Sequence, residues 1–135
     1  MRRKLVIMML AVSLGLAVAS PLWAHHSFAA EYDQAKPITL KGVVTKIEWT
    51  NPHIFFYIDV KDEAGNTVNW GFEGGSPNSL FREGWKRDSL KIGDQVSVDG
   101  YRAKDGSRLA NARTVKLSDG RKIFAGSSTD GGPLK

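Results

Sequence analysis

The chain contains no cysteine among its 135 residues. That absence excludes disulfide bonds, thiolate metal sites, thiol nucleophiles and a lipid anchor on a processed cysteine. The fold must therefore be stabilised by its hydrophobic core, for which a chain of this length is sufficient. Histidine is almost as scarce, with three residues. Any hypothesis about imidazole chemistry therefore concerns those three positions.

Motifs of the common enzyme classes are also missing. The chain has no GxxxxGK[ST] phosphate loop, no GxGxxG sequence and no HExxH pair. No serine nucleophile stands in a recognised triad context, because Ser27 beside His26 lies on a segment too flexible to hold a nucleophile against a base. We therefore expect a binding protein and not an enzyme, with a copper-dependent oxidase as the enzymatic alternative.

An excess of charge of one sign is lacking as well. The whole chain has a formal charge of +5, but residues 1–24 contribute three basic side chains and no acidic ones. The remaining 111 residues carry only +2, and their charges are evenly spread. Binding to nucleic acid requires a concentrated positive surface, so we expect no nucleic-acid partner.

The first 24 residues have the pattern of a secretory signal peptide. Basic residues at positions 2–4 precede an uncharged, largely apolar run over positions 5–22. We predict cleavage after Ala24; cleavage after Ala19, within a better small-x-small sequence, is the alternative. Either cut leaves a periplasmic or secreted protein without a permanent membrane span, and its partners are then expected in the cell envelope.

Beyond the signal the apolar residues alternate with the period of two that is typical of β-strands. We predict an extended arm over residues 25–37, one β domain ending at residue 125, and a disordered tail over residues 126–135. The predicted strands cover residues 38–49, 53–61, 67–73, 95–102 and 109–117, with a short edge strand near 121–125. The phase of the first strand slips at Gly42, which indicates a β-bulge or a sharp coiling of a long strand there.

A short helix is predicted between the third and fourth of these strands. Ser76 followed by Pro77 is typical of a helix N-terminus, and the helix should end near Arg82 or Trp85. Five strands with one helix in this position are the element order of an OB-fold-like small β-barrel. A small open sheet and a fragment of a β-sandwich are the alternatives.

Three short motifs resemble a family of small exported (periplasmic) bacterial proteins of unknown function. They are the sequence HHSFAAEYD at residues 25–33, GVV at residues 42–44 and WTNPH at residues 49–53. The resemblance extends over nearly all of the predicted mature chain. It implies an exported, β-rich domain and assigns no catalytic residues.

The three histidines form the candidate metal site. Cleavage after Ala24 would give His25 a free amine, which chelates a metal together with the His25 ring, and His53 could add a third nitrogen. Alternatively, the amine chelates with the amide and ring of His26. Such nitrogen-rich sets favour copper, with Glu31 and Asp33 available as oxygen donors or as outer partners. The competing interpretation is that the terminal histidines are incidental and that His53 caps a turn.

A second candidate site is aromatic. If the second and third strands pair, the face opposite their apolar residues carries Phe55, Tyr57, Asn69 and Glu73. In OB-folds this face binds oligonucleotides or oligosaccharides, so a planar small ligand or a protein partner would suit it. The alternative is that Phe28 and Tyr32 of the arm cover the two aromatic rings.

Overall fold

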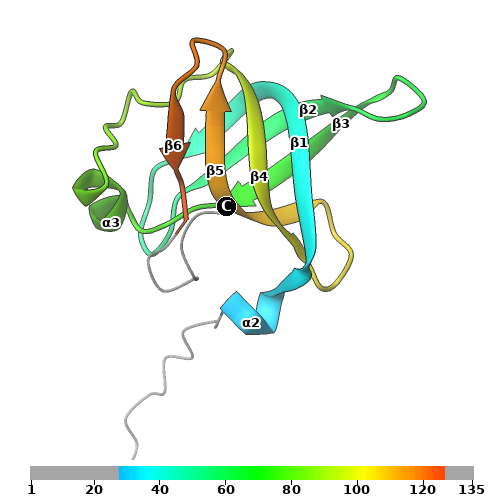
Figure 1. Cartoon of the computed structure of the whole chain (residues 1–135), viewed down its shortest axis with the longest axis horizontal. Helices are drawn as coiled ribbons and strands as arrows, with labels where there is room; N and C mark the ends of the chain where they lie inside the picture. Colours follow the sequence, from blue (N-terminus) through cyan, green and yellow to red (C-terminus); the bar gives the residue numbers. More distant parts are fainter. Residues whose placement is uncertain (1–27, 127–135) are drawn as a thin grey trace, which may run out of the picture.

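Six β-strands and two short helices make up the part of the chain that the structure describes, residues 28–126 of a computed structural model (Figure 1). In chain order they are α2 (Phe28–Glu31), β1 (Tyr32–Glu48), β2 (Phe55–Lys61), β3 (Thr67–Glu73), α3 (Pro77–Arg82), β4 (Gln95–Ala103), β5 (Leu109–Leu117) and β6 (Lys122–Phe124). Within these residues no helix combines the length and apolarity needed to cross a membrane.

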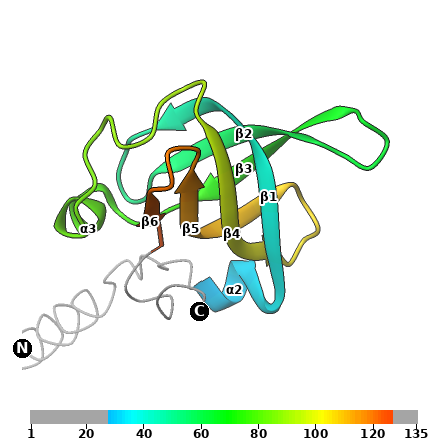
Figure 2. The same ribbon diagram turned by 45° about the horizontal axis from the view of Figure 1, so that its top comes forward.

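The strands form a closed ring. Antiparallel pairing gives the order β3-β2-β1-β4-β5-β6, and a short parallel pairing of β3 with β5 closes a ring of five strands. Strand β6 flanks β5 outside the ring, and α3 lies at one end (Figure 2). The mainly β class, the five principal strands and the helix between β3 and β4 confirm the prediction from the sequence. An open sheet is excluded because β3 pairs with β5.

The first strand differs from its prediction in two ways. It begins at Tyr32 and not at residue 38, so a helical turn and the start of β1 occupy much of the predicted arm. The irregularity in its pairing with β2 lies between Val44 and Lys46 and not at Gly42.

Gly42 has a different structural role from the predicted bulge. It pairs with Val60 of β2 on one side and with Val96 of β4 on the other. A Cβ atom added to it would lie 2.2 Å from the carbonyl oxygen of Asp59. Glycine is therefore needed because the backbone of β2 approaches closely.

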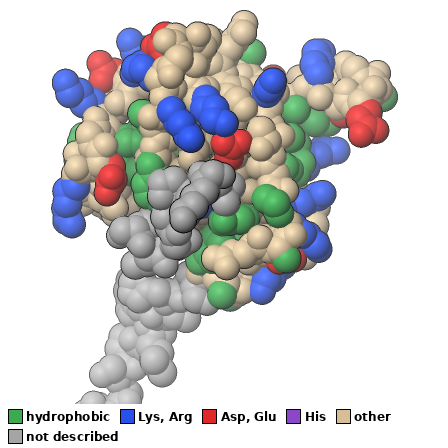
Figure 3. All heavy atoms as spheres, in the orientation of Figure 1, with side chains coloured by type: hydrophobic (Ala, Val, Ile, Leu, Met, Phe, Trp, Pro, Cys, Tyr) green, Lys and Arg blue, Asp and Glu red, His purple; other side chains and the backbone are tan. Residues whose placement is uncertain are grey.

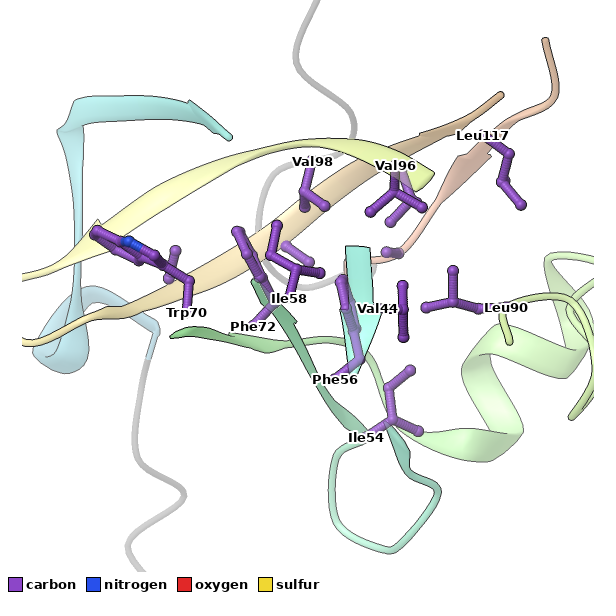
Figure 4. Packing of buried hydrophobic residues seen from close by; sticks show 14 of the residues in the cluster. Val44, Ile54, Phe56, Ile58, Trp70, Phe72, Leu90, Val96, Val98 and Leu117 are labelled. Atoms are coloured by element: carbon purple, nitrogen blue, oxygen red, sulfur yellow. The ribbon is translucent and has the colours of Figure 1, made fainter. Parts of the chain in front are cut away.

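The hydrophobic core fills the inside of the ring. Alternate residues of β2 point into this core. Phe56, Ile58 and Val60 are buried, whereas the residues between them are partly exposed. Figure 4 shows Phe56 and Phe72 projecting side by side into the core from neighbouring strands, and their rings stack with centroids 5.3 Å apart. Stacked aromatic pairs in a dry core stabilise a fold beyond the area they bury.

Helix α3 has the N-terminus that the sequence predicts. Ser76 is its N-cap, Pro77 occupies the first turn, and the Ser76 hydroxyl accepts a hydrogen bond of 3.2 Å from the backbone N–H of Ser79. The cap satisfies a backbone donor that has no partner inside the helix.

Replacing Ser76 with alanine is expected to lower the free energy of unfolding by about 1 kcal/mol, because the Ser79 N–H loses its acceptor. Urea denaturation measures the change. Asn78→Ala is the matched control, since Asn78 is exposed in the same helix. Equal losses in the two variants would contradict the capping role.

Candidate functional site

A buried carboxylate on the outside of the ring is the centre of the candidate site. Glu73 is the last residue of β3 and lies in register with Phe55 of β2 and Asn111 of β5. Strand alternation directs it away from the core, because its neighbour Phe72 points inward. Glu73 is nevertheless only 9% exposed. Burying a carboxylate is costly unless it is paired, so its partners define the site.

The Glu73 carboxylate binds two side chains from distant parts of the sequence. The hydroxyl of Tyr32, at the start of β1, donates a hydrogen bond to Oε2. The ring nitrogen Nδ1 of His53, in the loop before β2, is hydrogen-bonded to Oε1. We call Tyr32, His53 and Glu73 the Glu73 cluster.

This pairing determines which nitrogen of His53 is available. A carboxylate accepts hydrogen bonds, so it favours the tautomer, or the protonated ring, in which Nδ1 carries a hydrogen. In the neutral ring the lone pair is then on Nε2. The His53 side chain is 37% exposed, so it remains accessible from outside. A histidine bound to a metal is held in the same way, with its second nitrogen donating to a carboxylate.

The neighbouring backbone holds His53 beside Glu73. The next residue, Ile54, is fully buried in the core. Its N–H donates to the carbonyl of Gly75 at 3.1 Å, and its carbonyl accepts from the N–H of Gly74 at 2.9 Å. The loop before β2 is therefore fastened to the residues that directly follow Glu73, which explains why a histidine at position 53 meets that carboxylate.

The start of the described chain lies against the same side of the ring. The ring of Phe28 stacks on Tyr32 and meets Tyr101 of β4 edge-on, with centroids 5.7 Å away in both cases. Tyr101 is in register with Asn111, the residue that also pairs with Glu73. Helix α2 is thus fixed beside the Glu73 cluster. In these ring contacts Phe28 packs on Tyr32 and Tyr101, whereas the alternative drawn from the sequence was that Phe28 and Tyr32 cover Phe55 and Tyr57.

Asn111 adds a polar group that the fold itself does not use. It is 3% exposed, and its Oδ1 has no hydrogen-bond partner in the structure of residues 28–126. A buried acceptor without a donor lowers the stability of the fold by about 1–3 kcal/mol, so a functional role for this group has to be considered. Its register with Glu73 places this acceptor at the same site.

Of the three histidines predicted as metal ligands, His53 alone lies in the described region. His25 and His26 are outside it. Within residues 28–126, no three histidine, aspartate or glutamate side chains group closely enough to hold a metal ion. That finding does not extend to the two N-terminal histidines.

The predicted aromatic face forms, but three of its four members are already engaged. Strands β2 and β3 pair as expected, which places on one face the residues Phe55, Tyr57, Asn69 and Glu73. Asn69 donates a hydrogen bond of 2.8 Å to Asp59, its partner in the register. Glu73 belongs to the Glu73 cluster.

Tyr57 on this face is covered by charged neighbours. Its hydroxyl donates to Glu48 at 3.1 Å, and the Lys46 ammonium lies 5.1 Å from its ring centroid. Burial, followed by the hydrogen bond to Glu48, raises the pKa of Tyr57. The hydrogen bond from Lys46 lowers the pKa of Glu48, and Glu48 in turn raises the pKa of Lys46. An ion pair thus covers part of the ring and leaves Phe55 as the less engaged aromatic.

Tyr32 and Asn111 are site residues that the sequence did not reveal in this role. The sequence placed Tyr32 in the predicted arm, as a ring that could cover Phe55 and Tyr57. In the structure its hydroxyl donates a hydrogen bond to Glu73. Asn111 lies in the predicted strand 109–117, and its pairing with Glu73 follows only from closure of the ring.

Comparison with known proteins gives one match. Residues 14–112 match a family of unknown function (DUF6152). No curated protein and no solved structure matches the chain.

Proposed function

The chain belongs to the family of unknown function DUF6152, and we propose that it is an exported, non-enzymatic protein that binds a divalent metal, copper first, at its mature N-terminus. The proposed ligands are the His25 amine and ring with His53, or with His26 in the local arrangement. Glu73 would orient His53, and Tyr32 would hold the chain start near it.

The pairing of His53 Nδ1 with the Glu73 carboxylate is the observation that carries the proposal. A surface histidine that merely caps a turn has no need of a buried carboxylate. A metal ligand does, because the carboxylate fixes the ring and directs the lone pair of Nε2 outward. Conversely, a carboxylate that is 9% exposed is a costly means of holding a structural histidine.

The length of the chain allows the terminal amine to reach His53. Only His26 and Ser27 separate His25 from Phe28. A chain extends at most about 3.3–3.6 Å per residue, so the amine would lie within about 12 Å of Phe28. Phe28 stacks on Tyr32, and Tyr32 bonds to the same carboxylate as His53. The short segment that carries the terminal amine is therefore attached to the chain beside the Glu73 cluster.

The donor set favours copper among the divalent metals. An amine and imidazole rings are nitrogen donors, and copper heads the affinity series for such ligands. Asn111 Oδ1 could accept a hydrogen bond from an amine hydrogen or from a metal-bound water, which would satisfy the buried acceptor. The chain lacks cysteine, so thiolate coordination is not an alternative.

Titration of Cu(II) into two forms of the protein tests the proposal. One form begins at His25, verified by intact mass, and the other carries one additional residue before it. The extended form is expected to bind about tenfold more weakly, equivalent to about 1.4 kcal/mol, because its first amine is displaced from the site. Equal affinity would remove the terminal amine from the coordination sphere. The intact mass of the protein as cells export it is a second test. A mass showing that the exported protein begins at Ser20 would remove the proposed site altogether.

A further inference from the structure

A row of lysines crosses the outer face of the ring, away from the Glu73 cluster. Lys41 of β1 is in register with Ser97 of β4, Ser97 with Lys116 of β5, and Lys116 with Lys122 of β6. Residues in register on antiparallel strands share a face, with Cβ atoms about 4.5–5.5 Å apart. Figure 3 shows basic side chains gathered over these strands. We call Lys41, Lys116 and Lys122 the lysine row.

The row is separate from the proposed metal site. Lys116 lies five residues along β5 from Asn111, which at about 3.3 Å per residue is roughly 16 Å. Binding of a ligand by the lysine row would therefore not depend on copper or on the N-terminus.

Nearby acids neutralise only one of the three lysines in the row. The Lys116 ammonium forms an ion pair of 3.1 Å with Asp99, which also accepts a hydrogen bond from Thr39. In the described structure neither Lys41 nor Lys122 forms an ion pair. Like charges directly opposite each other on neighbouring strands are destabilising, and Lys116 and Lys122 are such a pair. Asp99 compensates Lys116 alone, so Lys41 and Lys122 keep charges that a ligand of opposite charge would compensate.

A groove adjoins the row and supplies further donors. Its volume is about 400 Å³, and it lies between β1, β4 and the end of β5. Its walls include Lys41 and Lys116, the hydroxyls of Ser97 and Ser118, and the exposed apolar side chain of Val43. This volume lies in the range of small-ligand sites, about 300–1,000 Å³. Ammonium and hydroxyl groups together are donors suited to an anion.

We propose that this groove binds a ligand with two or more phosphate groups, held by the lysine row. Lys41 and Lys116 stand two strands apart, about 9.5 Å between backbones, with Lys122 one strand further. A single small anion would have to draw the three ammonium groups together against their mutual repulsion, whereas linked phosphates offer a separate anionic group to neighbouring lysines. Each phosphate monoester carries about −1.5 to −2 charges near neutral pH, and such charges compensate the repulsion within the row. Ser97, midway between Lys41 and Lys116, can donate to a bridging oxygen.

Isothermal titration of the processed protein with pyrophosphate at low salt tests the proposal. Lys41→Gln and Lys122→Gln are each expected to weaken binding about fivefold, and the double variant more than tenfold. Lys86→Gln, which removes the same charge at an exposed position between α3 and β4, should leave the affinity unchanged. Lys122→Gln should not lower the free energy of unfolding, because it removes a like-charge contact.

A parallel measurement distinguishes the source of the phosphate. If the protein binds phosphatidylglycerol vesicles and the double variant does not, the proposal is supported with a lipid surface as the source of the phosphate. If the protein binds pyrophosphate but not the vesicles, the proposal is supported with a free ligand as the source. Binding to neither, or equal weakening by Lys86→Gln, would overturn it. His53→Ala should leave pyrophosphate affinity unchanged, so this test stands apart from that of the metal site.

Discussion

Replacing Phe56 with alanine is expected to lower the free energy of unfolding by about 3–5 kcal/mol, a large part of the stability of a domain this size. Phe56 is fully buried and stacks on Phe72. Truncation removes apolar surface from the core and leaves a cavity, because the closed ring limits how far the surrounding strands can collapse. Urea denaturation followed by tryptophan fluorescence measures the loss.

Phe55→Ala is the matched control. The two phenylalanines are neighbours on β2, but Phe55 points outward and is only partly buried. Its truncation should cost about 1–1.5 kcal/mol, the share of the burial free energy that a half-exposed ring contributes. Equal losses at the two positions would contradict the assignment of the faces of β2.

The sequence predicted the strands best where one face is buried without interruption. Strands β3 and β5 begin and end at the predicted residues, and the inward face of β2 was predicted correctly. The first six residues of β1 were missed for a physical reason. Residues 34–37 are exposed, and the register with β4 slips between Tyr32 and Pro37. No apolar period marks such a segment, so only its pairing with β4 makes it a strand.

The candidate site was predicted in separate pieces. Alternation placed Glu73 on the outer face, and the turn before β2 marked His53, but neither observation joins them. The separations of 41 residues between Tyr32 and Glu73, and of 20 between His53 and Glu73, are bridged by ring closure and by the backbone contacts of Ile54. Tertiary contacts of this kind leave no local signal in a single sequence.

In protein that begins at His25, His53→Ala is expected to weaken Cu(II) binding more than tenfold, equivalent to more than about 1.4 kcal/mol. The substitution removes a ring whose Nδ1 is held by Glu73 and whose Nε2 is accessible. Glu73→Gln should weaken binding by about 10–100-fold, the usual effect of changing an outer partner of a metal-bound histidine. The amide can present either its oxygen or its NH₂ group to Nδ1, so it no longer imposes one tautomer.

Competition with a chromophoric chelator measures these affinities, and Asn69→Ala is the control on the same face of the ring. An unchanged affinity in His53→Ala would contradict the three-nitrogen arrangement and favour a local chelate at His25 and His26. The Glu73→Gln variant separates a structural effect from a coordinating one. Loss of stability without loss of copper affinity would mean that the carboxylate only fastens the loop, whereas loss of affinity in a stably folded variant would mean that the orientation of the His53 ring sets the strength of the site.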